Sequence, residues 1–403
     1  MRKVGTIPVI VCALGVLGIL AWFGWHSYKK DATVVTQYQT SEEASNVYVR
    51  FDMEAYDTIL SNFWKQATDV DMASLFQLSL EKAVGTTSEP LATSTRAGTA
   101  AMLGVAFDKA GSVAAEKALA LQTLQVVLYN LPPVGRDELL TSVQQTQLKD
   151  TVDNINPNNN LYQDLGVPSG ASTQQVDQAY TQKEATLTGT TSPQGQAELK
   201  QVTYAHEVLA SATAKAQYDE NQVEPTVFAH TMGSHTLYLY ISKIAPTTIN
   251  EFAQAIENAS TTPALTSLIL DLRGNIGGDL DFTQDIMSLF LGPNQYAFDL
   301  YHQGNYNAQR TPNVGPLPAL SQYKEIAVLT DDMTQSTAEL TASSLRRYRL
   351  AYLVGTKTRG WGSVEQNFPI KTVIDPNDQY ALLLVVDLTL GDDQQPIGAR
   401  IDR

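Results

Sequence analysis

The chain has 403 residues, 43% of them hydrophobic, so it is long enough to bury two or three separate cores. Its formal net charge of -15 leaves no basic stripe to neutralise phosphates, which argues against nucleic acid as a partner. Cys12 is the only cysteine, so an intramolecular disulfide is excluded, although this does not identify the cellular compartment.

An apolar run at residues 4–25, with two basic residues on each side, is the first predicted element. It is long enough to cross a hydrocarbon core of roughly 30 Å as one helix. No small-x-small cleavage site follows it, which favours an uncleaved anchor over a removed signal peptide. We therefore expect residues 1–30 to form a single-pass membrane anchor, with the membrane as one partner of the chain.

Residues 31–155 are expected to form a linker and a helical region. Thr33 to Ser45 is polar and lacks periodicity, whereas Tyr48 to Val84 has apolar residues at three- and four-residue intervals. Ala97 to Leu131 is an alanine-rich helical stretch, and Arg136 to Val152 predicts another helix after a Pro-Pro break. Such apolar faces usually pack into a bundle core, and they would also allow a homo-oligomer to form through this region.

Residues 156–222 have a pattern of their own, which consists of Asn160-Leu-Tyr-Gln-Asp-Leu-Gly-Val-Pro168, Ala205-His-Glu-Val-Leu209 and Lys215-Ala-Gln-Tyr-Asp219. This combination resembles a J-domain, which implies two antiparallel helices packed through tyrosine and leucine positions. The loop of such a domain carries His-Pro-Asp for docking to an ATP-dependent chaperone, but here the loop reads Thr188-Gly-Thr-Thr-Ser-Pro-Gln-Gly195. We therefore expect a J-domain-like helical hairpin without chaperone stimulation, which acts as a spacer, a lid or a substrate-recognition element.

Strands alternate with helices in residues 223–403. Thr236 to Ser242 alternates like a half-buried strand, and Thr266 to Leu272 is a nearly continuous apolar run, which is typical of a buried strand. The other predicted strands are 325–329, 351–354, 368–373 and 380–389, and the predicted helices are 248–258, 282–291 and 338–347. This order predicts an α/β core, a mixed sheet with covering helices, whose functional groups lie at strand ends and in turns.

Three motifs follow one another in this last part of the chain: Asp271-Leu-Arg-Gly-Asn-Ile-Gly-Gly278, then Gln335-Ser-Thr-Ala-Glu339, then Gly355-Thr-Lys-Thr-Arg-Gly-Trp-Gly-Ser-Val364. Their order and spacing resemble the C-terminal processing (tail-specific) serine peptidase family. The resemblance implies an endopeptidase that acts on extracytoplasmic polypeptides, so the bulk of the chain would lie outside the cytoplasm. Neither a metal-ligand cluster nor a phosphate-binding loop is present in the sequence, so no cofactor is implied.

Ser336 occupies the position of the nucleophile in this family, before a small residue and an acidic one. The family's oxyanion donors are backbone N–H groups, which correspond here to Thr337 and to Gly277 or Gly278. Backbone amides do not depend on side-chain identity, so this half of the machinery survives substitution. The alternative is purely structural: Ser336 would cap a helix, with Glu339 completing a capping box, and the glycines would only permit a tight turn.

The family's general base is a lysine twenty-five positions after the nucleophile, and here Trp361 replaces it. An indole N–H only donates, so Trp361 cannot accept the serine proton. Glu365 stands four residues further on, where the family often has glutamine, and strand parity with position 361 makes it a candidate alternative base. Alternatively, Glu365 is exposed and Gln366 takes the polar role. Lys357 is expected on the surface, and Arg359 cannot deprotonate in a useful range.

Two functions from different classes follow. The first is a membrane-anchored serine endopeptidase of the C-terminal processing type with an unconventional base. The second is a non-catalytic polypeptide-binding or scaffolding pseudopeptidase, since the loss of a base typically lowers the rate by several orders of magnitude. His230 and His235 are further candidates for the base only if the fold brings them to the serine.

Overall fold

The computed structural model describes residues 40–85 and 91–391. The membrane anchor predicted at residues 1–30 lies outside these ranges. Within them, no helix is both long enough and apolar enough to cross a membrane.

The chain divides into two compact units. Of the described residues, the helical unit contains 40–85, 91–141, 302–304 and 364–387. The sheet unit contains 142–301, 305–363 and 388–391. The boundaries predicted after residues 30, 155 and 222 differ from this division and stay predictions.

The described part of the helical unit begins with five helices, and two predictions for this region were wrong. The range 33–45 was expected to be a linker, but its end is helical because Thr40 and Glu43 form a capping box. The alanine-rich stretch 97–131 forms two helices rather than one, with Gly111 at positive φ between them. The helices are α2 (Ser41–Ser45), α3 (Val47–Asn62), α4 (Asp69–Val84), α5 (Arg96–Asp108) and α6 (Val113–Asn130).

The strand β1 (Glu138–Leu140) follows these helices and pairs antiparallel with the first part of β10 (Ala381–Leu390), so that Glu138 lies opposite Leu383. The helix predicted at 136–152 therefore starts later than expected, as α7 (Ser142–Asp153). A strand predicted at 368–373 also lies earlier, as β9 (Ser363–Pro369), which pairs with β10.

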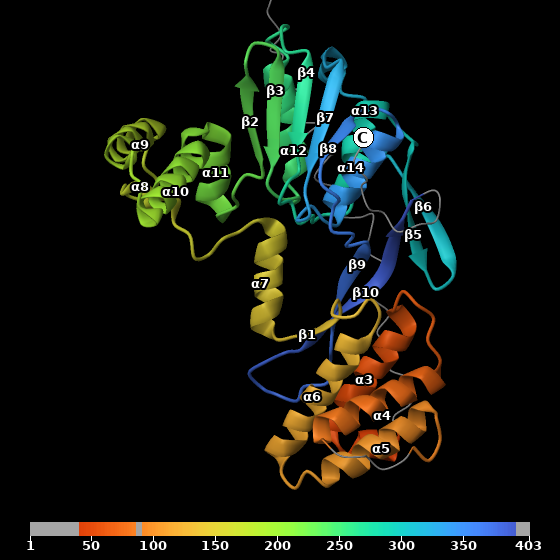
Figure 1. Cartoon of the computed structure of the whole chain (residues 1–403). Helices are drawn as coiled ribbons and strands as arrows, with labels where there is room; N and C mark the ends of the chain where they lie inside the picture. Colours follow the sequence, from red (N-terminus) through yellow and green to blue (C-terminus); the bar gives the residue numbers. More distant parts are fainter. Residues whose placement is uncertain (1–39, 86–90, 392–403) are drawn as a thin grey trace, which may run out of the picture. The chain divides into compact units, whose positions relative to one another are not determined.

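The sheet unit contains a mixed sheet in the order β2-β3-β4-β7-β8 (Figure 1). β2 pairs antiparallel with β3, and the other neighbours are parallel. The predicted mixed α/β core preceded by a helical region is confirmed, although β2 was not expected. The strands are β2 (Val227–Met232), β3 (Thr236–Ile241), β4 (Ser267–Asp271), β7 (Glu325–Thr330) and β8 (Tyr352–Gly355).

Helices and a second ribbon of strands complete this unit. Apolar residues of α12, α13 and α14 pack with alternate residues of β3, β4 and β7 into one core, in which Leu239, Phe252 and Ile286 are fully buried. The C-terminal end of β10 pairs antiparallel with β5, and Thr389 lies opposite Leu300. The elements are α12 (Thr248–Ala259), α13 (Phe282–Leu291), β5 (Tyr296–His302), β6 (Asn305–Arg310), η2 (Pro318–Gln322) and α14 (Thr337–Arg347).

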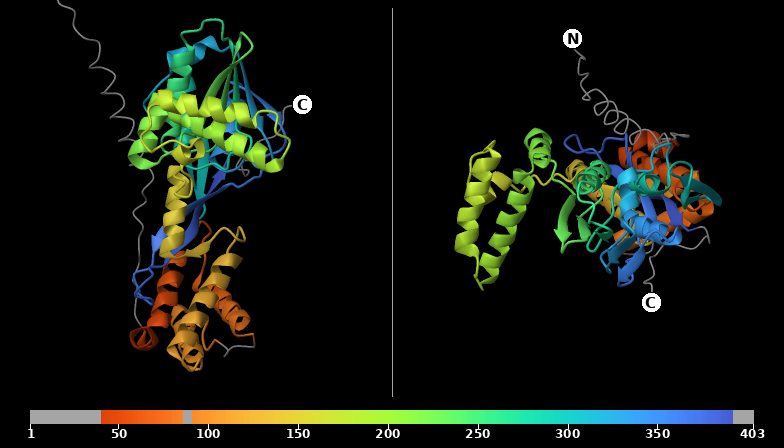
Figure 2. Two further views of the ribbon diagram at one scale, coloured as in Figure 1. Left: turned by 90° about the vertical axis from the view of Figure 1, so that its left-hand side faces the viewer. Right: turned by 90° about the horizontal axis from the view of Figure 1, so that it is seen from above.

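Four helices at residues 161–221 have a hydrophobic core of their own, which includes Leu161, Tyr162 and Val208. The longest two, α9 and α10, lie side by side (Figure 2). Ile155 forms an isolated bridge with Val223, so the two ends of this segment meet. The J-domain-like interpretation of these helices stays a prediction. They are α8 (Leu161–Leu165), α9 (Thr173–Leu187), α10 (Pro193–Ala210) and α11 (Ala212–Asn221).

Three buried acidic side chains of the helical unit differ in their surroundings. Arg96 pairs with Asp57 at 2.7 Å and with Glu43 at 2.8 Å. Asp52, by contrast, is fully buried in α3, and neither of its carboxylate oxygens has a hydrogen-bond partner within the described residues. Burial therefore raises the pKa of Asp52 well above its ordinary value.

Ionisation of Asp52 should destabilise the fold. The folded state holds this proton more tightly than the unfolded chain, so the free energy of unfolding falls as pH rises above the unfolded pKa. We expect Asp52→Asn to raise the free energy of unfolding by at least about 1 kcal/mol at pH 8 and by less at pH 5. Urea denaturation followed by far-UV circular dichroism measures both values. Asp108→Asn, at an exposed position, is the matched control, and an Asp52→Asn effect independent of pH would contradict the assignment.

Candidate active site

The turn after β4 is fixed by a buried asparagine. Asn275 is fully buried, and its Nδ2 donates to the carbonyl of Ile241 at 2.9 Å. Its Oδ1 accepts from the N–H of Gly277 at 2.8 Å. At the end of the same strand, Arg273 pairs with Asp271 at 2.6 Å. Burial alone would raise the pKa of Asp271, but the hydrogen bonds from Arg273 lower it.

The two glycines of this turn are required by close contacts. A Cβ on Gly277, whose φ is +83°, would lie 2.7 Å from the Cβ of Ser336. A Cβ on Gly278, whose φ is +148°, would lie 1.6 Å from the carbonyl oxygen of Ile244. Both positions therefore exclude any side chain. The structure brings the glycine turn and Ser336 into direct contact, as the nucleophile interpretation requires.

The two glycine amides are not equivalent. The N–H of Gly277 is already used by Asn275, as described above. The N–H of Ile244 donates to the carbonyl of Gly277, and the carbonyl of Ile244 accepts from the N–H of Asp279. Neither of these two hydrogen bonds uses the N–H of Gly278. That N–H has no hydrogen-bond partner within the described residues. Of the two glycines named from the sequence, Gly278 is thus the one with a free donor.

Ser336 lies in the turn between β7 and α14, and its backbone is strained. Its φ is +56° and its ψ is -129°, whereas a helix N-cap normally has extended dihedrals with negative φ. Such a conformation costs on the order of 1–3 kcal/mol and is concentrated at functional sites. A capping role alone does not explain this strain. Next to it, Thr337 is buried, and its Oγ1 donates to the carbonyl of Gly278 at 3.1 Å.

Glu339 holds two separate turns together through one buried carboxylate. It is only 1% exposed and accepts three main-chain hydrogen bonds. Oε2 accepts from Ser336 at 2.8 Å and from Trp361 at 2.8 Å, and Oε1 accepts from Gly360 at 2.5 Å. Sequence reasoning treated Glu339 only as part of a local capping box and missed this role. An acidic residue between apolar ones at the start of a buried helix was the available signal.

The structure also brings Trp361 to the nucleophile position. Because the amide nitrogens of Ser336 and Trp361 donate to the same oxygen, they are separated by no more than twice the hydrogen-bond length. The position that the family resemblance assigns to a lysine thus lies beside Ser336. Trp361 is half-buried in a turn between Gly360 and Gly362, which both have positive φ.

The parity argument for Glu365 was wrong, because β9 begins at Ser363 and Trp361 precedes it in the turn. Glu365 lies in β9 within the helical unit and is half-buried. Burial, assisted by the charge of Glu365, raises the pKa of Asp137 to about 7. Gln366 is the next residue of the same strand, and the assignment of either one to the catalytic site stays a prediction.

The remaining candidates for the base lie elsewhere. His235 precedes β3, whereas Asn275 of the glycine turn contacts the last residue of that strand, at the opposite end. His230 lies on the edge strand β2, against the ring of Tyr238. Lys357 is exposed, as expected, and Arg359 is exposed as well.

Three acidic residues that follow the glycine turn were not identified from the sequence. Burial, assisted by the neighbouring carboxylates, raises the pKa of Asp281 to about 6 and that of Asp285 to about 7. Burial also raises the pKa of Asp279, which directly follows Gly278. Carboxyl groups that titrate near neutral pH can take part in proton transfer. Within the described residues, no group of acidic, histidine or cysteine side chains could hold a metal ion.

Replacing Glu339 by glutamine should loosen both turns at once. An amide offers only one oxygen, so at least one of the three N–H groups would face an NH₂ donor. We expect the free energy of unfolding to fall by about 1–3 kcal/mol and hydrogen exchange to accelerate at the amides of Ser336, Gly360 and Trp361. Exchange measured by mass spectrometry tests this, with exposed Glu325→Gln as the control. Unchanged exchange at these amides would refute the role of the carboxylate.

Comparison with known proteins agrees with this geometry. Residues 235–402 match peptidase family S41. A carboxy-terminal-processing protease of Bartonella bacilliformis is 28% identical over 136 residues, which are 33% of this chain and 31% of that protein. The carboxy-terminal processing protease CtpB of Bacillus subtilis is 26% identical over 147 residues, 36% of this chain and 29% of that protein. The chain thus matches about a third of the length of these curated relatives.

A solved structure supports the fold over a longer range. The photosystem II D1 C-terminal processing protease aligns with a TM-score of 0.50 and 13% identity, covering 91% of this chain and 93% of that chain. The glycine turn packed on Ser336, the strand order and these matches lead to one conclusion: residues 235–402 of this chain belong to peptidase family S41, that of the C-terminal processing peptidases.

Proposed function

We propose that this chain is a serine-type peptidase of the C-terminal processing class that cleaves polypeptides with Ser336 as the nucleophile. The observation that carries the proposal is the contact of Gly277 with Ser336, in which the serine keeps a strained backbone. Strain of this kind persists only where the surroundings enforce it, and Glu339 supplies that enforcement here.

The proposed reaction is acyl transfer through a serine ester. The Ser336 Oγ attacks the scissile carbonyl carbon, its proton passes to a base, and the carbonyl oxygen becomes negatively charged. The N–H groups of Thr337 and Gly278 are the proposed donors to that oxygen. The amine leaves with a proton, and water then hydrolyses the ester and restores the serine.

The base is the part of this mechanism that departs from the family. Trp361 stands at the lysine position and accepts no proton. Two carboxyl groups are proposed in its place. Glu365 is the candidate from the sequence, and Asp279 is a second candidate because it follows the glycine that offers the free N–H and because burial raises its pKa.

We also propose where the protein acts and what its insert does. Residues 1–30 would anchor it in a membrane by one helix, with the catalytic part on the extracytoplasmic side. The J-domain-like segment 156–222 would contribute to polypeptide recognition, and the helical region would provide a surface for a homo-oligomer. The length and flanking charges of the apolar run support the first proposal.

A second candidate function is a pseudopeptidase that binds polypeptides without cleaving them. Trp361 specifically favours it, because an indole replaces the one group that activates the serine. A half-buried indole would also reduce the space beside Ser336.

Substitutions at the two key positions separate these functions. If the chain is a peptidase, full-length protein should cleave β-casein, an unstructured polypeptide, and react with a fluorophosphonate, and Ser336→Ala should abolish both. Trp361→Lys should increase the cleavage rate by about 100-fold or more, since it restores a base. Cleavage that appears only in Trp361→Lys would instead establish the pseudopeptidase.

The dependence of cleavage on pH identifies the base. A carboxyl base must be ionised, so the rate should rise with pH through its pKa and then level off. If Asp279 is the base, Asp279→Asn should lower the rate by a factor of about 100 or more and remove the rise, while Glu365→Gln should change little. The reverse pattern would assign the role to Glu365. Equal profiles for wild type and both variants would exclude both carboxyl groups.

A further inference from the structure

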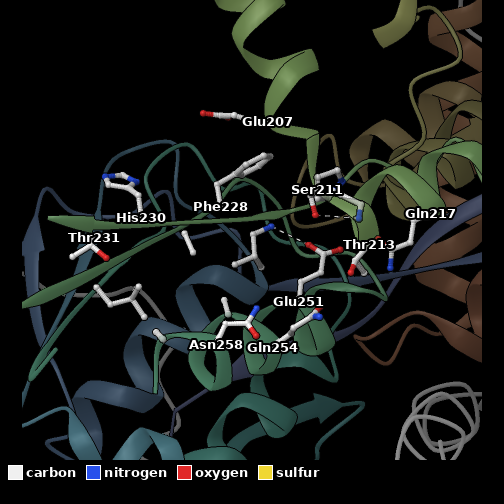
Figure 3. A pocket seen from close by; sticks show the side chains of 17 residues that line it. Glu207, Ser211, Thr213, Gln217, Phe228, His230, Thr231, Glu251, Gln254 and Asn258 are labelled. Carbon is white, nitrogen blue, oxygen red and sulfur yellow. Dashed lines mark hydrogen bonds between the residues drawn. The ribbon is translucent and has the colours of Figure 1, made fainter. Parts of the chain in front are cut away.

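The sheet unit contains a groove that lies away from Ser336 and runs along the free edge of β2. Its cavity volume is about 560 Å³. β2 lines one side, α12 forms the floor, and residues from the end of α10 and from α11 form the opposite wall (Figure 3). A cavity of this size suits a short ligand or a single extended segment but not a folded partner.

The edge of β2 offers main-chain hydrogen bonds that nothing in the described chain uses. β2 pairs only with β3, and Ser242 of the same ladder donates to the carbonyl of Thr226 at 2.9 Å. In an antiparallel pair, the main-chain N–H and C=O groups of successive residues point alternately toward the partner strand and away from it. In this register, those of Val227, Ala229 and Thr231 point away from β3. Glu251 accepts the N–H of Val227 at 3.0 Å, which leaves those of Ala229 and Thr231 free.

This edge also lacks the usual protection against strand addition. Edge strands are commonly guarded by charged side chains, proline or a bulge. β2 reads Val-Phe-Ala-His-Thr-Met, pairs without interruption over all six residues and is exposed from Ala229 to Met232. An exposed and unguarded edge beside a cavity is the arrangement in which proteins bind an extended peptide as an additional strand.

The charges along the groove indicate which side chains such a peptide should carry. Glu207 and Glu251 are the charged residues of its lining, which contains neither lysine nor arginine. Glu251 Oε2 accepts from the N–H groups of Thr226 and Val227 at the start of β2, while its Oε1 is buried and has no hydrogen-bond partner among the described residues. Glu207 is exposed at the rim. A basic side chain on the bound segment would complement this negative charge.

We propose that the edge of β2 binds an extended polypeptide segment with basic residues as an added strand, separately from the catalytic groups. Ala229 and Thr231 exchange main-chain hydrogen bonds with it, and α11 and α12 confine it. This site rests on the proposed function only in that its ligand is a polypeptide. It gives the J-domain-like helices a specific task, because they supply one wall of the groove.

Peptide binding to full-length Ser336→Ala protein tests this without any need for cleavage. The probe is a fluorescein-labelled octapeptide in which valine and threonine alternate and two positions carry lysine. Its binding is measured by fluorescence anisotropy. Its counterpart carries N-methyl groups on the alternate amides that would pair with the edge. We expect the methylated peptide to bind about tenfold more weakly, since main-chain hydrogen bonds are lost. Equal affinities would overturn the proposal.

Variants of the groove provide the matched comparison. Ala229→Pro removes one outward N–H, which an edge strand tolerates, and should weaken binding about tenfold, whereas Ala229→Ser should not. Glu207→Gln should weaken the lysine peptide but not a glutamine version of it. Undiminished binding to Ala229→Pro would overturn the proposal. A second outcome would also overturn it: sedimentation shows that the wild-type chain is a dimer and that Ala229→Pro dissociates this dimer. A second copy of the chain would then occupy the edge.

The two proposals fail in different ways. Edge-dependent peptide binding together with a wild-type chain that never cleaves would refute the proposed peptidase and leave the groove assignment standing. Cleavage that depends on Ser336, with no edge-dependent binding, would do the opposite.

Discussion

The candidate site depends on one buried carboxylate. Glu339 takes up three main-chain N–H groups from two turns that are far apart in the sequence, and so it fixes Ser336 and Trp361 beside each other. Hydrogen bonds to a charged acceptor contribute about 1.5–3 kcal/mol each, which is enough to offset the strain at Ser336. Because the bonds go to main-chain groups, this frame does not depend on which side chain occupies position 361.

That independence explains how this geometry persists with a tryptophan at position 361. The proposed oxyanion donors, Thr337 and Gly278, are also main-chain groups, and they lie in turns fixed by Asn275 and by the contact between Gly277 and Ser336. A tryptophan can therefore replace a lysine without disturbing the scaffold around it. The chemistry of this protein is decided by the side chains that surround an intact frame, rather than by the frame itself.

The parts of the fold that the sequence revealed are those with a strong apolar pattern. β3, β4 and α13 pack their apolar residues into one core, and their ranges were close to the observed ones. β2 and β6 are mostly exposed edge strands, so their sequences do not show the alternation of apolar and polar residues that a half-buried strand has. The resemblance of the motifs to the peptidase family predicted that Trp361 lies beside Ser336. The role of Glu339 beyond the capping box was missed because its partners at Gly360 and Trp361 are distant in sequence. Its position between apolar residues indicates burial but does not identify these partners.

The bridge between Ile155 and Val223 has a consequence for how this architecture could have arisen. It brings the entry and exit of the helical segment 156–222 together. Asn154 adds to this junction, since it donates to the carbonyl of Glu224 at 2.9 Å. A segment with adjoining ends can be exchanged for another of different length or fold while the strand that follows it keeps its place in the sheet. Evolution can thus exchange the segment without redesigning the sheet that follows it.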